Sequence, residues 1–315
     1  MLSFLSPNIR LAIFYIILIV FTCLPIWSVD YFINQDGSGH VYTAFLMFEL
    51  LKQNPEISQF YVFNSISIPN SSGHWLLVLL LQFFPAFTVT KIFVTLTYAL
   101  FVAAAGWLRF QTAGRAGVKT SFLIGAATGF NWLWLIGFYN FTIGVVAFLF
   151  TLGLFYRWRE KIGFPQAAVF SLLLIFVYLS HIISFVILSG SIFTIICFLP
   201  FSRLKRTLLW TLAAYLPILP LLFLYKSLSA SGGGFSPVWR SLDDPYSTAS
   251  WLYQIRVVDP FILISRRTLP FFSETSDFFI IFTPVLWLLA AYLCLASAAF
   301  HYYKRNPDYI KKYYP

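Results

Sequence analysis

The sequence contains few charged residues. Only 10% of its 315 residues are Asp, Glu, Lys or Arg, whereas 59% are hydrophobic. Soluble domains average roughly 25% charged residues, so this composition excludes an ordinary soluble protein and predicts a chain that is integral to a membrane. The long apolar segments do not alternate with polar residues, which argues against a transmembrane β-barrel. We therefore expect an all-α polytopic membrane protein.

Cysteine is also scarce. Cys23, Cys197 and Cys294 each lie inside an apolar segment. We interpret them as small hydrophobic residues, because their spacing favours neither a disulfide framework nor a zinc site. The net charge of +10 would suggest a nucleic-acid partner for a soluble chain. Here the basic residues follow the ends of apolar segments, so we expect a membrane partner and no nucleic acid.

Apolar segments recur along the whole chain. The segment 75–108 is too long for one crossing and is interrupted by Pro85 and Lys91, so we assign 75–86 to the membrane interface. With spans of about 17 to 25 residues, about eight crossings are predicted. They are 11–29, 92–108, 121–138, 141–156, 166–181, 182–200, 207–225 and 278–302. No small-residue cleavage site follows the first segment, so we interpret it as a retained span and not as a signal peptide.

The basic residues predict the orientation of these spans. With the N-terminus in the cytoplasm, the cytoplasmic segments hold most of the basic residues but only Glu160 and Asp308 among the acids. This asymmetry is what the positive-inside rule requires. The prediction is a single membrane domain over residues 1–315 with both termini in the cytoplasm. Its parts are a first extracytoplasmic loop (30–74), a second one (226–277) and a basic cytoplasmic tail (303–315).

One set of polar residues falls at the outer membrane face on this topology. Polar groups at such a depth are unfavourable unless they have partners, so their gathering on one face is informative. The set includes three of the four histidines of the chain. Its members are Asp30, Asp36, His40, His74, Asn140 and His181.

The stretch "QDGSGHVYTAFLMFELL", which starts at Gln35, predicts a helix lying on the outer membrane surface. Asp36 or Ser38 can cap its N-terminus, and apolar residues follow at helical spacing. Two interpretations of Asp36 and His40 stay open. They are either a cap and an interfacial side chain, or a pair that performs chemistry. Metal binding by these two alone is a weak alternative, because two ligands do not make a site.

The other members of the set also have structural alternatives. His74 follows the turn-rich "SIPNSSG" and can be an interfacial side chain. Asn140, in "GFYNF", can serve a tight turn. His181, in "YLSHIIS", is either a hinge satisfied by Ser180 and Ser184 or a wall of a polar cleft, and we favour the cleft.

The second extracytoplasmic loop contains arginines among aromatic residues. Arginine can grip phosphate oxygens with two hydrogen bonds, so Arg240, Arg256 and Arg266 are candidates for phosphate binding. The alternative is an interfacial loop in which these charges pair with acids, because the loop is neutral overall.

This arrangement resembles the GT-C superfamily of integral-membrane glycosyltransferases, in particular an uncharacterised bacterial branch. The resemblance covers roughly residues 8–225. It is carried by "VDYFINQDGSGH" after the first span, the helix behind it, the re-entry "IPNSSGHWLLVLLLQFFP", and the motifs "GFYNF" and "YLSH". The chain differs from such enzymes in that it is short and shows no clear paired-acid motif.

The resemblance implies transfer of a sugar from a polyprenyl-phosphate donor to an acceptor at the outer face of the bacterial inner membrane. Asp36 would be the base, with Asp30 as the alternative loop acid, and His40 would assist it or bind a divalent metal. The cleft and the phosphate would be held by His74, Asn140, His181, Arg240, Arg256 and Arg266. Alternatives are a transporter or flippase of a lipid-linked saccharide, and a non-catalytic accessory subunit. A transporter would be expected to show charged or broken helices at mid-membrane, which the predicted spans lack.

Overall fold

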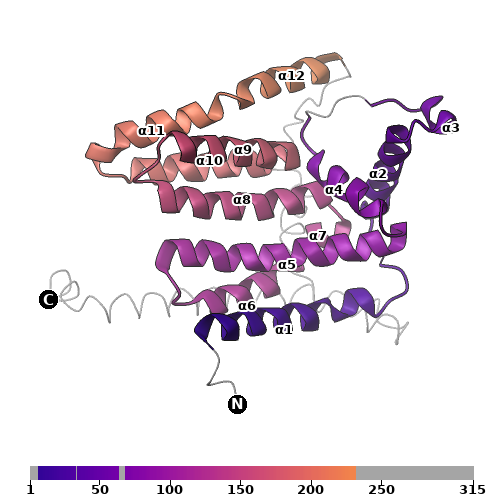
Figure 1. Ribbon diagram of the computed structural model, residues 1–315, viewed down its shortest axis with the longest axis horizontal. Helices are drawn as coiled ribbons and strands as arrows, with labels where there is room; N and C mark the ends of the chain where they lie inside the picture. The colour runs from indigo at the N-terminus through magenta and orange to yellow at the C-terminus, as the bar shows by residue number, and fades with distance from the viewer. Residues whose placement is uncertain (1–5, 33, 64–67, 232–315) are drawn as a thin grey trace, which may run out of the picture.

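The computed structural model describes residues 6–32, 34–63 and 68–231, and every regular element in these ranges is an α-helix (Figure 1). In chain order they are α1 (Pro7–Trp27), α2 (Gly37–Leu51), α3 (Pro55–Ser58), α4 (Ser72–Leu81), α5 (Ala86–Ala113), α6 (Val118–Gly129), α7 (Trp132–Ile136), α8 (Tyr139–Trp158), α9 (Phe164–Ser180), α10 (Ile182–Cys197), α11 (Phe201–Tyr215) and α12 (Ile218–Ser231). Helices α1, α5 and α8 are each long and apolar enough to cross a membrane, and the bent pair α11–α12 would make a fourth crossing. The described part is therefore that of a helical membrane protein. The predicted crossing 278–302 lies outside it.

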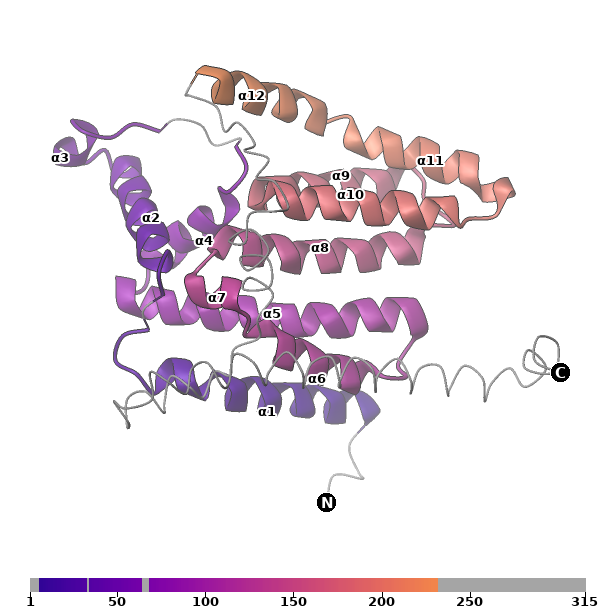
Figure 2. The same cartoon turned by 180° about the vertical axis from the view of Figure 1, so that it is seen from behind.

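The long helices form an antiparallel bundle (Figures 1 and 2). Helix α5 packs against α6 on one side and α8 on the other, and α9 and α10 continue the bundle beyond α8. Glycines permit close packing of α5 on α6, since a Cβ atom at Gly125 would lie 3.1 Å from the Ala105 side chain. One buried apolar cluster joins α1, α2, α4, α5 and the first turns of α8, and a second joins α8 to α12.

The segments 166–181 and 182–200, predicted as consecutive spans, form two separate helices that divide at His181. Helices α9 and α10 are separated by the single residue His181, whose backbone is extended at φ −164° and ψ 130°. The two helices pack against each other, so one extended residue is enough to reverse the chain.

The predicted crossing 121–138 is not one continuous helix. Helix α6 ends at Gly129, and a separate helix of five residues, α7, follows it. Asn131 caps α7 by accepting a hydrogen bond from the Trp134 N–H at 3.0 Å, and Gly137 ends it with φ +95°. A cap and a positive φ both favour a helix boundary, so the apolar segment divides into two pieces.

The predicted crossing 207–225 is also not one straight helix. Helices α11 and α12 meet at Leu216 and Pro217 with a bend of 43°. Proline has no N–H and its ring collides with the preceding turn, which explains the break. Helix α12 continues to Ser231, so the first residues of the predicted loop 226–277 are helical, and the remainder lies outside the described residues.

One end of the bundle carries most of the basic residues. The Arg115 guanidinium donates to Asn8, which ties the loop between α5 and α6 to the start of α1. Glu160 pairs with Arg203 and Arg159, and this joins the loop between α8 and α9 to α11. Also at this end are Arg109, Lys119, Arg157, Lys161, Lys205 and Arg206.

The opposite end is covered by α2, α3 and α4. Helix α2 runs across the direction of the long helices in both views, as expected for a helix on a membrane surface (Figures 1 and 2). Its apolar stripe is buried only in part, with Val41 and Ala44 buried and Phe45 and Leu51 exposed. Asp36 occupies the N-cap position, but its side chain makes no capping hydrogen bond, so the cap interpretation holds for its place and not for its carboxylate.

Candidate functional site

Two histidines meet at this end of the bundle. His40 in the first turn of α2 and His74 in the first turn of α4 approach within 2.8 Å, measured from His40 Nδ1 to His74 Nε2. A neutral imidazole carries one N–H, so one ring donates and the other accepts. The pair is held together by one proton between the two nitrogens.

Burial keeps both rings neutral. Burial, followed by the neighbouring His40 ring, lowers the pKa of His74 from its ordinary value of 6.5 to about 4, against a smaller opposing hydrogen bond with the backbone of Asn70. Burial also lowers the pKa of His40, and the negative charge of Asp36 opposes that shift. At neutral pH the pair is therefore uncharged and adds no positive charge of its own.

Tyr139 fixes the orientation of His40. Its ring stacks on the His40 ring with centroids 5.5 Å apart, and it packs against Phe93 on its other side. The Tyr139 hydroxyl is buried and accepts a hydrogen bond from Asn34 Nδ2 at 3.1 Å. The loop before α2 and the first turn of α8 thereby hold one catalytic candidate in place.

A close backbone contact places Asp36 beside His40. The Asp36 N–H donates to the Ile136 carbonyl oxygen at 2.7 Å, so the start of α2 lies on the end of α7. Gly37 makes this possible, because a Cβ atom there would lie 1.8 Å from Asn34 Oδ1 and 2.5 Å from the Tyr139 hydroxyl. The Asp36 carboxylate is half-buried and acts electrostatically on His40.

Asn140 joins the same cluster through α4. Its Oδ1 accepts a hydrogen bond from the Gly73 N–H at 2.7 Å, which fixes the orientation of the amide. The side chain is buried, with 3% exposed, and its Nδ2 has no hydrogen-bond partner among the described residues. Buried amide nitrogens almost always have a partner, so this one needs an explanation.

His181 borders the cluster from the junction of α9 and α10. Its Nδ1 accepts a hydrogen bond from the Ile183 N–H at 3.2 Å, so it caps α10, and its ring meets Phe141 edge-on. One residue earlier, Ser180 accepts a hydrogen bond from the Ser72 hydroxyl at 2.7 Å. The first turn of α4 is thus linked to α2, α8 and α9.

The structure brings together three of the predicted residues, His40, His74 and Asn140, around the first turn of α4, with Asp36 beside His40. His181 follows Ser180, which bonds to Ser72, but its own ring contacts Phe141 and the Ile183 N–H. Asp30 is exposed beyond the end of α1, and its part in the site stays a prediction. The remaining predicted residues lie outside the described ranges. They are Arg240, Arg256 and Arg266.

The described residues contain no group of three or more His, Cys, Asp or Glu side chains that could hold a metal ion. His40 and His74 direct one nitrogen each toward the other at 2.8 Å, so these two nitrogens are not available to a metal in this arrangement. A metal role for His40 would need its other nitrogen and further ligands.

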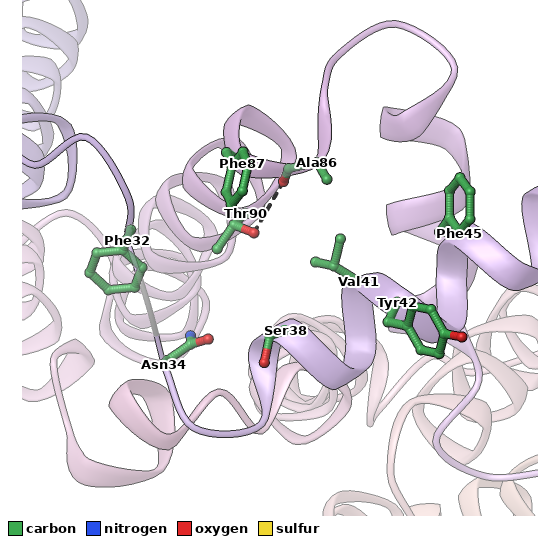
Figure 3. A pocket seen from close by; sticks show the side chains of 9 residues that line it. All are labelled: Phe32, Asn34, Ser38, Val41, Tyr42, Phe45, Ala86, Phe87 and Thr90. Atoms are coloured by element: carbon green, nitrogen blue, oxygen red, sulfur yellow. Dashed lines mark hydrogen bonds between the residues drawn. The ribbon is translucent and has the colours of Figure 1, made fainter.

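Asn34, which bonds to the Tyr139 hydroxyl, also lines a groove. Figure 3 shows side chains from the loop before α2, from α2 and from the start of α5 around it. Its volume is about 280 Å³. Aromatic rings dominate the lining, and the polar groups are those of Asn34, Ser38, Tyr42 and Thr90. Asn34 connects the groove to Tyr139, whose ring stacks on His40.

A larger cavity lies behind α4. It has a volume of about 660 Å³ and is lined by residues of α4, α5, α8 and α9. Its lining is almost entirely apolar. The hydroxyl groups of Ser71 and Ser72 stand at the end nearest the histidine pair, and Thr97 and Thr151 are the other polar lining residues.

Sequence reasoning missed Tyr139, Asn34 and Ser72. They lie in the stretches "GFYNF", "DYFINQD" and "PNSSGH", which also contain predicted site residues or adjoin them. Nothing in the sequence distinguished these three residues from other Tyr, Asn and Ser residues of the chain.

Comparisons of the chain with protein-family models, with curated proteins and with solved structures give no match. The function is therefore argued from the residues and their geometry.

Proposed function

We propose that the protein is a membrane glycosyltransferase that moves a sugar from a polyprenyl-phosphate donor to an acceptor at the outer face of a bacterial inner membrane. The observation that supports this most is the convergence of His40, His74 and Asn140 from three helices at the end of the bundle that is poor in basic residues. Convergent, partly buried polar groups beside a pocket are typical of an active site.

The chemistry requires one base and one stabilised leaving group. The acceptor oxygen forms a bond to the anomeric carbon of the sugar, the bond from that carbon to the phosphate oxygen breaks, and the electron pair leaves with the phosphate. The acceptor proton passes to Asp36, the base. His40 stands next to it and, through His74, can relay the proton.

The groove in Figure 3 suits the acceptor. Two of its lining residues, Ser38 and Val41, are sequence neighbours of Asp36 and His40 at the start of α2, and it offers the amide of Asn34 and the hydroxyl of Ser38 between aromatic rings. Pockets that mix apolar walls with a few polar groups are typical of small-molecule sites.

The test of this proposal is the substitution Asp36→Asn. It keeps the shape of the side chain but removes the base, so transfer should fall roughly 10²- to 10⁴-fold. Transfer would be measured with the purified protein in lipid nanodiscs, using a panel of polyprenyl-phosphate-linked sugars and following the release of polyprenyl phosphate.

Glu56→Gln is the matched control. Glu56 is an exposed carboxylate of α3 in the same loop, so the same chemical change there should leave transfer and membrane insertion unaltered. Turnover of Asp36→Asn close to that of the wild-type protein would exclude Asp36 as the base. If no sugar of the panel were transferred by the wild-type protein, the glycosyltransferase proposal itself would be contradicted.

A further inference from the structure

Positive charge is concentrated where the loop between α8 and α9 meets the start of α11. Helix α11 lies beyond α9 and α10 at the edge of the bundle (Figures 1 and 2), and two hydrogen bonds hold the loop on its first two turns. The Thr207 hydroxyl donates to the Arg159 carbonyl oxygen at 2.6 Å, and Arg206 Nε donates to the Ile162 carbonyl oxygen at 3.1 Å. Six basic residues are thereby brought to this junction. They are Arg157, Arg159, Lys161, Arg203, Lys205 and Arg206.

Among the described residues at this end of the bundle, a single acid opposes the positive charge. Glu160 pairs with Arg203 and lies 3.5 Å from Arg159, so its one negative charge is shared between two arginines. Six basic residues and one acid leave the junction with a net charge of +5. Lys161 and Arg206 are exposed, and neither forms an ion pair with an acid of the described ranges. Their counter-ions therefore come from outside this part of the chain.

Apolar side chains continue from the charged junction along α11. Leu209 and Trp210 follow Arg206 by three and four residues, so they lie one turn further along the helix. Leu209 is 64% exposed, and Trp210 meets the ring of Phe164 edge-on with centroids 6.2 Å apart. Phe164 is itself 71% exposed. A charged junction followed by exposed apolar side chains matches a molecule that has an anionic head and a hydrocarbon tail.

We propose that this junction binds an anionic phospholipid, with the phosphate between Lys161 and Arg206 and the acyl chains over Leu209 and Phe164. The bond to the Ile162 carbonyl oxygen orients the Arg206 guanidinium, and its terminal nitrogens can still donate to phosphate oxygens. Clusters of Lys and Arg at the ends of membrane helices are typical of sites for such headgroups. Inorganic phosphate would leave the apolar side chains uncovered, which favours the phospholipid. The inference is independent of the proposed function.

The lipid can be located without any substitution. The purified protein in phosphatidylcholine nanodiscs would be photolabelled with phosphatidylglycerol that carries a diazirine near the top of one acyl chain. We expect the label on peptides that contain Phe164, Leu209 or Trp210. A label spread evenly over the exposed helices, or confined to helices other than α9 and α11, would overturn the assignment.

Lys161→Gln tests the contribution of charge. Lys161 is exposed and has no ion pair within the described ranges, so the substitution should leave the fold unchanged. Removal of one cation beside the phosphate should raise the lipid concentration for half-maximal labelling about fivefold. The matched control is Lys119→Gln, which removes the same charge from an exposed position in the first turn of α6 at the same end of the bundle and should leave this concentration unchanged. Equal shifts in the two variants would indicate attraction to the whole basic end and would contradict a site at the junction.

Two comparisons separate the phospholipid from other ligands. Unlabelled phosphatidylglycerol should displace the probe, whereas inorganic phosphate at the same concentration should leave it bound. Phosphatidylcholine with the same diazirine has a phosphate and two chains but no net charge, so it should label these peptides at least about fivefold less. Displacement by inorganic phosphate would indicate a site for the free anion, and equal labelling by the two lipid probes would indicate apolar contact alone. Either result would overturn the proposal.

Discussion

The hydrogen bond between His40 and His74 makes protonation of the pair unfavourable. Both rings are largely shielded from water, which disfavours a charged imidazole. If both rings were protonated, two positive charges would face each other across the 2.8 Å between His40 Nδ1 and His74 Nε2. Of the groups around the pair, Asp36 favours a charged His40, whereas the Tyr139 hydroxyl, which is neutral near pH 7, does not. The pair is thus neutral near pH 7 and takes up a proton only at acidic pH.

The first consequence is a pH dependence of stability. His74 has a pKa of about 4 in the folded protein against 6.5 for the ordinary group, so the unfolded chain binds the proton more tightly. The stabilisation is fully present above pH 6.5 and is lost as the pH falls toward 4, by roughly 1–3 kcal/mol. Thermal unfolding of the detergent-solubilised protein between pH 7.5 and pH 4.5 would measure it.

His74→Gln is the control for this prediction. Glutamine can still form a hydrogen bond with His40 but does not titrate, so the variant should lose less stability between the two pH values than the wild-type protein. If the two proteins lost the same amount, the pH dependence would arise from other groups.

The residues of the site were predictable because polar side chains are rare in this chain. His40, His74, Asn140 and His181 stood out against apolar segments, and the topology placed them at one face. Their contacts were not predictable, since the bond between His40 and His74 joins two helices whose packing no local pattern encodes. Of the two interpretations left open for Asp36, the capping one applies only to its position, because its carboxylate makes no hydrogen bond to the first turn of α2.

At the scale of elements, the docking of α2 depends on a glycine at its start. A methyl group at Gly37 would overlap Asn34 and the Tyr139 hydroxyl, so Gly37→Ala must displace one of them. We expect a loss of about 1–3 kcal/mol in stability and a loss of transfer, because the ring that stacks on His40 moves. Thermal unfolding and the transfer assay would measure the two effects.

Gly39→Ala is the matched substitution on the same helix. A methyl group at Gly39 would meet nothing within 4 Å, and alanine is favoured over glycine in a helix by about 0.4–1 kcal/mol. This variant should therefore be as stable as the wild-type protein or more so, with normal transfer. Equal behaviour of the two variants would contradict the packing argument.

Hydropathy predicted where most helices lie but not where they are interrupted. The segments 121–138 and 207–225 are apolar throughout, and summed hydropathy does not distinguish one span from two shorter helices. The breaks follow from Asn131 and Pro217, which act through backbone hydrogen bonds. Such residues are also tolerated within membrane helices when neighbours satisfy the backbone, so the sequence alone did not decide between a kink and a boundary.

At the scale of the whole molecule, the two ends of the bundle differ in charge. Among the described acids only Glu160 lies at the basic end, and the proposed site lies at the other. The positive-inside rule predicts that the basic end faces the cytoplasm and that the proposed site faces outward. This orientation is what links the geometry to a reaction at the outer face.

Labelling of single cysteines tests that orientation. In a protein with Cys23, Cys197 and Cys294 replaced by alanine, Ser58→Cys at the site end and Ala116→Cys at the basic end each provide one exposed thiol. A membrane-impermeant maleimide applied to intact spheroplasts should label Ser58→Cys at once and Ala116→Cys only after permeabilisation. The reverse pattern would place Asp36 and the histidine pair in the cytoplasm. Transfer at the outer face would then be impossible, because the base would lie on the wrong side of the membrane from the acceptor.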